Sequence, residues 1–103
     1  MLFRSLAVQL QEDDPALRYE YGAALFNAQR VEEAREEFQR AVDLDPWFAR
    51  SYFPLAYILE NQGHDAEAIA LYRSYADRAP QSEAAKIAFA KSHAAALSGQ
   101  QPD

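Results

Sequence analysis

The sequence predicts an all-α protein of about six helices, and three observations lead to that prediction. Apolar residues recur at helical spacing almost everywhere and nowhere alternate for long, as they would in a strand. Prolines and glycines divide the chain into pieces of helix length. The pattern also repeats when the chain is shifted by 34 residues. The expected helices span roughly residues 2–11, 15–28, 31–44, 48–62, 65–78 and 82–98.

Composition bounds the class of protein. The chain has 103 residues, of which 50% are hydrophobic and 25% are charged, which is typical of one soluble globular domain. The first residues turn polar too soon for a secretory signal, and no apolar run is long enough to span a membrane, so we expect a cytoplasmic protein. The absence of cysteine excludes disulfides and thiolate chemistry. A net charge of -6 with scattered basic residues disfavours nucleic acid as a partner.

Helix starts are indicated by capping residues. Asp14-Pro15 and Asp45-Pro46 each place a carboxylate before a proline that suits the first helical position, so helices should begin near both. Ser82 is expected to cap the last helix.

Helix ends and one irregularity follow from glycine and proline. Gly63, Pro80 and Gly99 are expected to end the fourth, fifth and last helices. Pro54 lies inside the fourth expected helix, where it predicts a kink or a late helix start, because proline cannot donate a backbone hydrogen bond. A local irregularity is favoured there over a functional bend.

The two copies of the repeat share small, aromatic and proline positions. In the first copy these are Tyr21, Gly22, Leu25, Ala34, Phe38, Ala41 and Pro46. In the second copy they are Tyr52, Leu55, Ala56, Leu59, Ala68, Tyr72 and Pro80. Through these residues the chain resembles the tetratricopeptide repeat (TPR) family, whose units have the same period.

The resemblance implies a right-handed superhelical stack of antiparallel helix pairs that serves protein–protein interaction. It predicts one TPR-like domain over residues 1–103. The expected parts are a partial repeat helix (1–14), repeat one (15–48), repeat two (49–82), a terminal capping helix (83–98) and a flexible tail (99–103).

Packing gives these positions a mechanical role. Gly22 and Ala34 are expected to face each other in the first hairpin, as Ala56 and Ala68 do in the second, because small side chains let two helices approach closely. The ring on the second helix of each hairpin, such as Phe38, is expected to wedge between that hairpin and the next.

The first helix of each hairpin should line the concave side of such a stack. A second row of apolar and polar residues on these helices predicts a peptide-binding groove, here called the predicted groove. Its members are Tyr19, Ala23, Phe26, Asn27, Arg50, Phe53, Tyr57, Glu60, Asn61 and Lys91. Simple core packing is an equal alternative for Tyr19 and Phe53. An aromatic groove on an acidic protein suits an apolar or mildly basic segment of a partner protein.

Some members of the TPR family grip acidic C-termini with a dicarboxylate clamp. The resemblance places Tyr19, Ala23, Arg50, Pro54 and Ala84 at the clamp positions, and only one of these residues is basic. Binding of an acidic chaperone tail is therefore disfavoured.

Catalytic and metal-binding patterns are absent from the sequence. The histidines, His64 and His93, form no pair at ligand spacing. Carboxylates cluster in two places, at Glu12, Asp13 and Asp14 and at Glu32, Glu33, Glu36 and Glu37. We interpret Asp14 as a helix cap and the glutamates as a convex face shared with Arg35 and Arg40. We expect no enzyme activity, cofactor or metal.

Three functional hypotheses follow, and a peptide-binding adaptor is favoured. The second is a self-assembling module, because the expected N-terminal helix and the last helix, with Ile87, Phe89 and Leu97, are apolar and could pair with other copies. The third is a regulatory TPR segment of a larger enzyme or complex.

Overall fold

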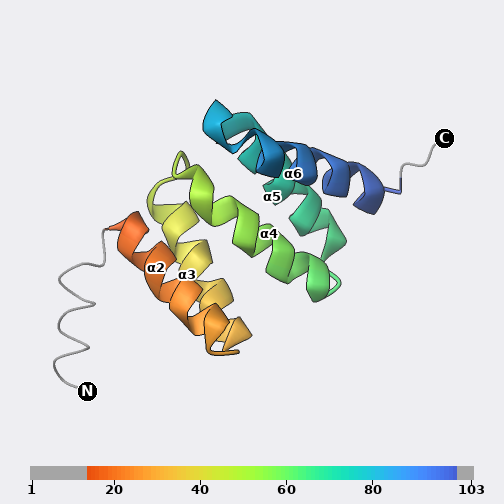
Figure 1. Ribbon diagram of the computed structural model, residues 1–103. Coiled ribbons are helices and arrows are strands. Elements are labelled where there is room, and N and C mark those ends of the chain that lie inside the picture. The colour runs from red at the N-terminus through yellow and green to blue at the C-terminus, as the bar shows by residue number, and fades with distance from the viewer. Residues whose placement is uncertain (1–13, 100–103) are drawn as a thin grey trace, which may run out of the picture. The chain divides into compact units, whose positions relative to one another are not determined.

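The computed structural model describes residues 14–99, which contain five α-helices, two 3₁₀ turns and no strand (Figure 1). The elements are α2 (Pro15–Asn27), α3 (Val31–Leu44), η1 (Ala49–Ser51), α4 (Tyr52–Asn61), α5 (Asp65–Arg78), η2 (Gln81–Glu83) and α6 (Ala84–Leu97). The all-α prediction is confirmed. The helix expected at 2–11 and residues 100–103 of the expected tail lie outside the described residues.

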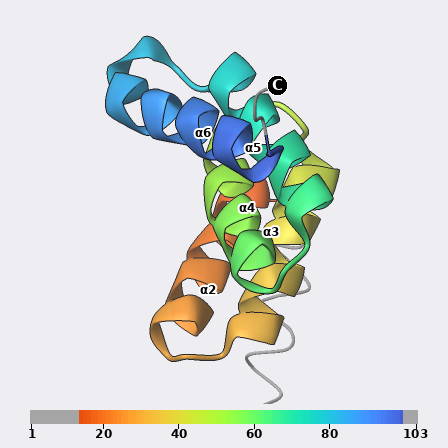
Figure 2. The same cartoon turned by 90° about the vertical axis from the view of Figure 1, so that its right-hand side faces the viewer.

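The chain divides into two structural units, Met1–Phe48 and Ala49–Asp103. Within the first unit, α2 and α3 form a helical hairpin. Within the second, α5 packs against both α4 and α6 (Figure 2).

The start of α2 follows the prediction. One carboxylate oxygen of Asp14 accepts hydrogen bonds from the backbone N–H groups of Ala16 (3.0 Å) and Leu17 (3.3 Å), and Pro15 occupies the first helical position. Two amide groups that the helix itself leaves unpaired are thus satisfied by one side chain.

Asp45 does not cap the next helix, so that prediction is wrong. Its side chain accepts a hydrogen bond from the N–H of Trp47 (3.0 Å), and its carbonyl accepts one from the N–H of Phe48 (2.9 Å). This local turn follows the end of α3 directly, and helical structure resumes only at Ala49. An aspartate can stabilise a turn over its own neighbours as readily as a helix start, and here the turn forms.

Ser82 is also wrongly assigned as a cap. It lies inside the turn η2, and the residue before α6 is Glu83, whose side chain makes no capping hydrogen bond. The N–H of Glu83 instead bonds to the carbonyl of Pro80 at 2.9 Å, so a 3₁₀ turn leads into the helix.

Pro54 causes the late helix start that was one of its two predicted effects. The fourth helix was expected from residue 48, but α4 begins at Tyr52, after the 3₁₀ turn η1. Pro54 is then the third residue of α4, where a backbone N–H has no partner within the helix. The missing donor therefore costs the helix no hydrogen bond.

The two hairpin turns are built alike. Gly63 follows α4 with φ +83, and the N–H of the next residue bonds to the carbonyl of Leu59 at 2.8 Å. Gln29 follows α2 with φ 69, and the N–H of the next residue bonds to the carbonyl of Leu25 at 2.8 Å. Both turns are Schellman-type helix ends, which favour glycine at the left-handed position. Only the second hairpin has glycine there.

The core of the first unit explains its glycine. Phe38 is buried with Leu25, Ala34 and Ala41, and its ring lies over Gly22. A Cβ atom at residue 22 would lie 2.9 Å from Cε1 of Phe38. The ring of Phe38 is therefore the nearest obstacle to a larger side chain at residue 22, a contact that was not predicted from the sequence.

The core of the second unit is aromatic. Tyr72 and Tyr75 are its largest fully buried side chains. The ring of Tyr72 packs against Phe53 of α4 (centroids 5.9 Å apart) and Phe89 of α6 (6.5 Å). Tyr72 thus joins the hairpin α4–α5 to the helix that follows it, and such ring pairs add stabilisation beyond their buried area.

Candidate functional site

The ten residues of the predicted groove divide between the two structural units. Tyr19, Ala23, Phe26 and Asn27 belong to the first unit, and Arg50, Phe53, Tyr57, Glu60, Asn61 and Lys91 belong to the second. Each group is described within its own unit.

In the first unit the predicted residues separate into packing and surface positions. The half-buried ring of Tyr19 packs against Phe38 (centroids 5.7 Å apart) and edge-on against Phe48 (6.0 Å). Ala23 is half-buried, whereas Phe26 and Asn27 near the end of α2 are exposed. Tyr19 therefore stabilises its own hairpin, and Phe26 with Asn27 presents the accessible surface.

Phe53 in the second unit is likewise mainly a packing residue. Its half-buried ring lies 5.1 Å from the ring of Tyr75, 5.9 Å from that of Tyr72 and 5.5 Å from that of Phe89. A ring with three aromatic neighbours stabilises the contact between α4 and the two later helices. These contacts favour the core-packing alternative for Phe53.

Among the predicted groove residues of the second unit, Arg50, Tyr57, Asn61 and Lys91 are exposed. The ring of Tyr57 is 43% exposed, one of the larger apolar surfaces that this unit presents. The side-chain amide of Asn61 donates a hydrogen bond to the carbonyl of Tyr57 at 2.8 Å. That bond holds the amide against the backbone of α4 and leaves its side-chain carbonyl oxygen and second N–H for other partners.

Glu60 lies at the centre of a polar cluster that joins α4, α5 and α6. Its Oε1 atom accepts a hydrogen bond from the hydroxyl of Tyr72 (2.7 Å) and lies 3.2 Å from Nδ1 of His93. The imidazole of His93 in turn stacks on the ring of Phe89, with centroids 4.0 Å apart. Burial, assisted by the hydrogen bond and the negative charge of Glu60, raises the pKa of Tyr72 well above its ordinary value.

Sequence reasoning missed the ion pair between Arg18 and Glu37. The guanidinium Nη1 lies 2.8 Å from the carboxylate Oε1, and the two side chains are only 7% and 14% exposed. Glu37 was predicted to lie on a convex face with Arg35 and Arg40, but its side chain is largely buried and pairs with Arg18 instead. The repeat could have revealed this pair. Residue 18 is equivalent to residue 52, 34 residues later, which is among the repeat's predicted packing positions. A basic residue at a packing position needs an acidic partner nearby.

The second unit has a different polar contact at the equivalent place. Nη1 of Arg78 donates a hydrogen bond to the hydroxyl of Tyr52 at 2.6 Å, and the guanidinium lies 5.4 Å from the centre of the Tyr52 ring. The two hairpins therefore place different polar groups at the same repeat position.

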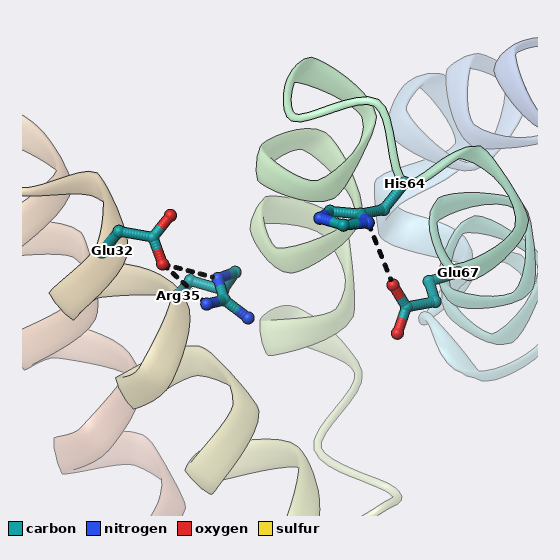
Figure 3. A network of polar contacts seen from close by, with 4 residues as sticks. All are labelled: Glu32, Arg35, His64 and Glu67. Atoms are coloured by element: carbon teal, nitrogen blue, oxygen red, sulfur yellow. Dashed lines mark hydrogen bonds and ion pairs between the residues drawn. The ribbon is translucent and has the colours of Figure 1, made fainter.

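Other acidic residues, such as Glu32 and Glu67, form short-range pairs at the surface. Arg35 pairs with Glu32, with nitrogen and oxygen 2.6 Å apart, and Nδ1 of His64 lies 3.7 Å from the Glu67 carboxylate. Figure 3 shows both pairs. Each pair is three residues apart on one helix or at its start, the spacing at which side chains meet.

Among residues 14–99, no three histidine, aspartate or glutamate side chains come together as a metal site would require. Within the same range, no helix has the length and apolar character needed to cross a bilayer.

Comparison with known families agrees with this architecture. Two family models described as tetratricopeptide repeat match the chain, one over residues 15–46 and the other over residues 41–83. A search of curated proteins finds no match. The matched region includes both helical hairpins and the aromatic and small residues that pack them. The chain belongs to the tetratricopeptide repeat family.

Proposed function

We propose that this protein binds a peptide or a helix of a partner protein through the predicted groove. TPR units are in general protein–protein interaction modules and are typically non-catalytic, which supports an adaptor function. The observation that carries the proposal is the exposure of Phe26 and Tyr57 on the first helix of each hairpin, each with an exposed asparagine close by.

The chemistry of these residues suits a peptide. Exposed rings offer apolar area at little cost in side-chain entropy, and the amides of Asn27 and Asn61 can pair with the backbone of a bound segment. The net charge of -6 favours a segment that is apolar or mildly basic. Binding of this kind requires neither a cofactor nor a reactive side chain.

The experiment is an affinity capture from lysate of the source organism with the intact protein and two variants. Tyr57→Ala combined with Asn61→Ala removes the exposed ring and amide of α4. Trp47→Ala removes a ring that is 72% exposed but lies outside the predicted groove, and serves as the matched control. Circular dichroism verifies that all three proteins fold alike.

A partner that is captured by the intact protein and by the control, and lost by the double variant, supports the proposal. A partner retained equally by all three proteins contradicts binding through the groove. If only further copies of this same protein were captured, the self-assembling module would be favoured instead.

A further inference from the structure

Glu60 is the carboxylate of the predicted groove, and one of its two oxygens is held from within the core. Its Oε1 atom accepts the hydroxyl of Tyr72 at 2.7 Å and lies 3.2 Å from Nδ1 of His93. Tyr72 is fully buried, so the hydroxyl that holds the carboxylate is itself fixed by packing. The orientation of Glu60 is therefore set before any ligand arrives.

These polar contacts of Glu60 all involve Oε1, and its second carboxylate oxygen, Oε2, takes no part in them. The Glu60 side chain remains 22% exposed. No group among residues 14–99 forms a hydrogen bond or an ion pair with its Oε2 atom. A carboxylate oxygen that is fixed in place and keeps its acceptor capacity is suited to a donor from outside the chain, most strongly to a charged one.

Partly exposed aromatic residues of α4 and α6 lie on the same side of this unit as the carboxylate. Tyr57 precedes Glu60 by three residues, so both lie on one face of α4, and its ring is 43% exposed. From α6, the imidazole of His93 reaches Glu60 and stacks on Phe89, which is 40% exposed. Ring faces attract cations and accept the methylene stem of a long basic side chain.

We propose that Glu60 selects the charge of the segment that the groove binds, by accepting a lysine or arginine side chain at Oε2. The stem of that side chain rests on the exposed parts of Tyr57 and Phe89. The inference rests on the proposed peptide-binding function and adds to it a basic residue at a defined place, beside an apolar one.

The other charged groove residues of the second unit differ from Glu60 in the sign of their charge. Arg50 and Lys91, the other charged groove residues of this unit, are both cations, and His93 adds no negative charge. A preference for a basic side chain can come only from Glu60 among these residues. Neutralising Glu60 therefore removes that preference and shifts selection toward neutral or acidic side chains.

The experiment is selection from a displayed library of random twelve-residue peptides against three proteins. They are the unmodified chain, Glu60→Gln and Glu67→Gln. The amide oxygen of Glu60→Gln can still accept the hydroxyl of Tyr72, so the variant should fold. Glu67 is an exposed carboxylate of α5 whose side chain is 68% exposed, and its substitution is the matched control for loss of one negative charge.

The expected result is enrichment of lysine or arginine next to aromatic or aliphatic residues with the unmodified chain and with Glu67→Gln, and loss of that enrichment with Glu60→Gln. For one selected peptide, replacing its basic residue by glutamine should weaken binding to the unmodified chain about tenfold. The same replacement should change binding to Glu60→Gln less than about twofold, because the two changes remove the same contact.

Two outcomes would overturn the inference, and they differ in what they leave standing. Enriched peptides without a basic residue, or the same basic preference with Glu60→Gln, would reject the role of Glu60 while leaving peptide binding intact. No enrichment with any of the three proteins would reject the peptide-binding groove and this inference with it.

Discussion

The ring of Phe38 lies so close over Gly22 that a Cβ atom there would be 2.9 Å from Cε1 and 3.0 Å from Cδ1 of the ring. Phe38 is 2% exposed and has little room to move aside. Gly22→Ala should therefore destabilise the protein by about 1–3 kcal/mol through overpacking, less the ~1 kcal/mol that alanine gains over glycine in a helix. Urea denaturation followed by circular dichroism measures the net change.

A second substitution tests the cause. Phe38→Leu alone should destabilise the hairpin, because it removes a buried ring. Combined with Gly22→Ala, it should cost less than the sum of the two single changes, since leucine leaves space for the new methyl group. Strict additivity would mean that the contact with Phe38 does not explain glycine at residue 22.

The left-handed turns predict opposite effects at equivalent positions. Gln29 has φ 69, so Gln29→Gly should relieve local strain and raise the free energy of unfolding by about 1 kcal/mol. Gly63 has φ +83, and Gly63→Ala should lower that free energy by about 1 kcal/mol, although nothing lies within 4 Å of the added methyl group. Thermal unfolding of both variants measures the changes, and equal signs would contradict the strain argument.

The ion pair between Arg18 and Glu37 predicts a large single-variant effect. Arg18→Met leaves the carboxylate of Glu37, whose side chain is 14% exposed, without its partner. That variant should lose about 3 kcal/mol of stability, whereas Arg18→Met combined with Glu37→Leu should recover most of it, because the unpaired charge is gone.

An exposed carboxylate on the same helix serves as the control. Glu32 pairs with Arg35 at 2.6 Å, but its side chain is 64% exposed. Glu32→Gln should change stability by less than about 0.5 kcal/mol, because water and salt screen such a pair. Denaturation curves of the unmodified protein, Arg18→Met, the double variant and Glu32→Gln give the free energies of unfolding to be compared. A cost for Glu32→Gln as large as that for Arg18→Met would contradict the role given to burial.

The raised pKa of Tyr72 predicts how stability changes with pH. Folding favours the protonated phenol, whereas the unfolded chain ionises near the ordinary value of 10.0. The contribution of Tyr72 is therefore complete below pH 10 and is lost as pH rises above it, by about 1 kcal/mol at pH 11.

The test compares the protein with Tyr72→Phe from pH 8 to pH 11. Phenylalanine cannot ionise, so the variant should be less stable at pH 8 through the lost hydrogen bond to Glu60, yet should lose less stability above pH 10. Chemical denaturation at each pH gives both quantities. Parallel curves for the two proteins would show that ionisation of Tyr72 is not linked to unfolding.

Local sequence signals were sufficient for much of the fold. The expected helices at 31–44 and 65–78 coincide with α3 and α5, and the expected cap at Asp14 is confirmed. Periodicity and repeat length carry this information because each helix must bury one face, and the repeat places these faces at constant intervals. Helix starts at Asp45 and Ser82 were wrong, because short polar side chains can serve turns as well as caps.

For the candidate site, the sequence identified which helices would present surface residues but not which side chains pack. Tyr19 and Phe53 have the same residue type and spacing as exposed rings, and only their aromatic neighbours show that they are largely packing residues. The place of the groove and its ligand remain predictions.

The sequence alone determined an all-helical chain of repeated hairpins, because helix spacing, turn residues and a period of 34 residues are properties of neighbours along the chain. Only the tertiary structure decided that Arg18 pairs with Glu37 and that Glu60 joins Tyr72 and His93, whose numbers differ by 19, 12 and 33. Such contacts depend on the distance and rotation between packed helices. Those quantities are set by the volumes of side chains such as Gly22 and Phe38 in combination, and no single segment encodes them.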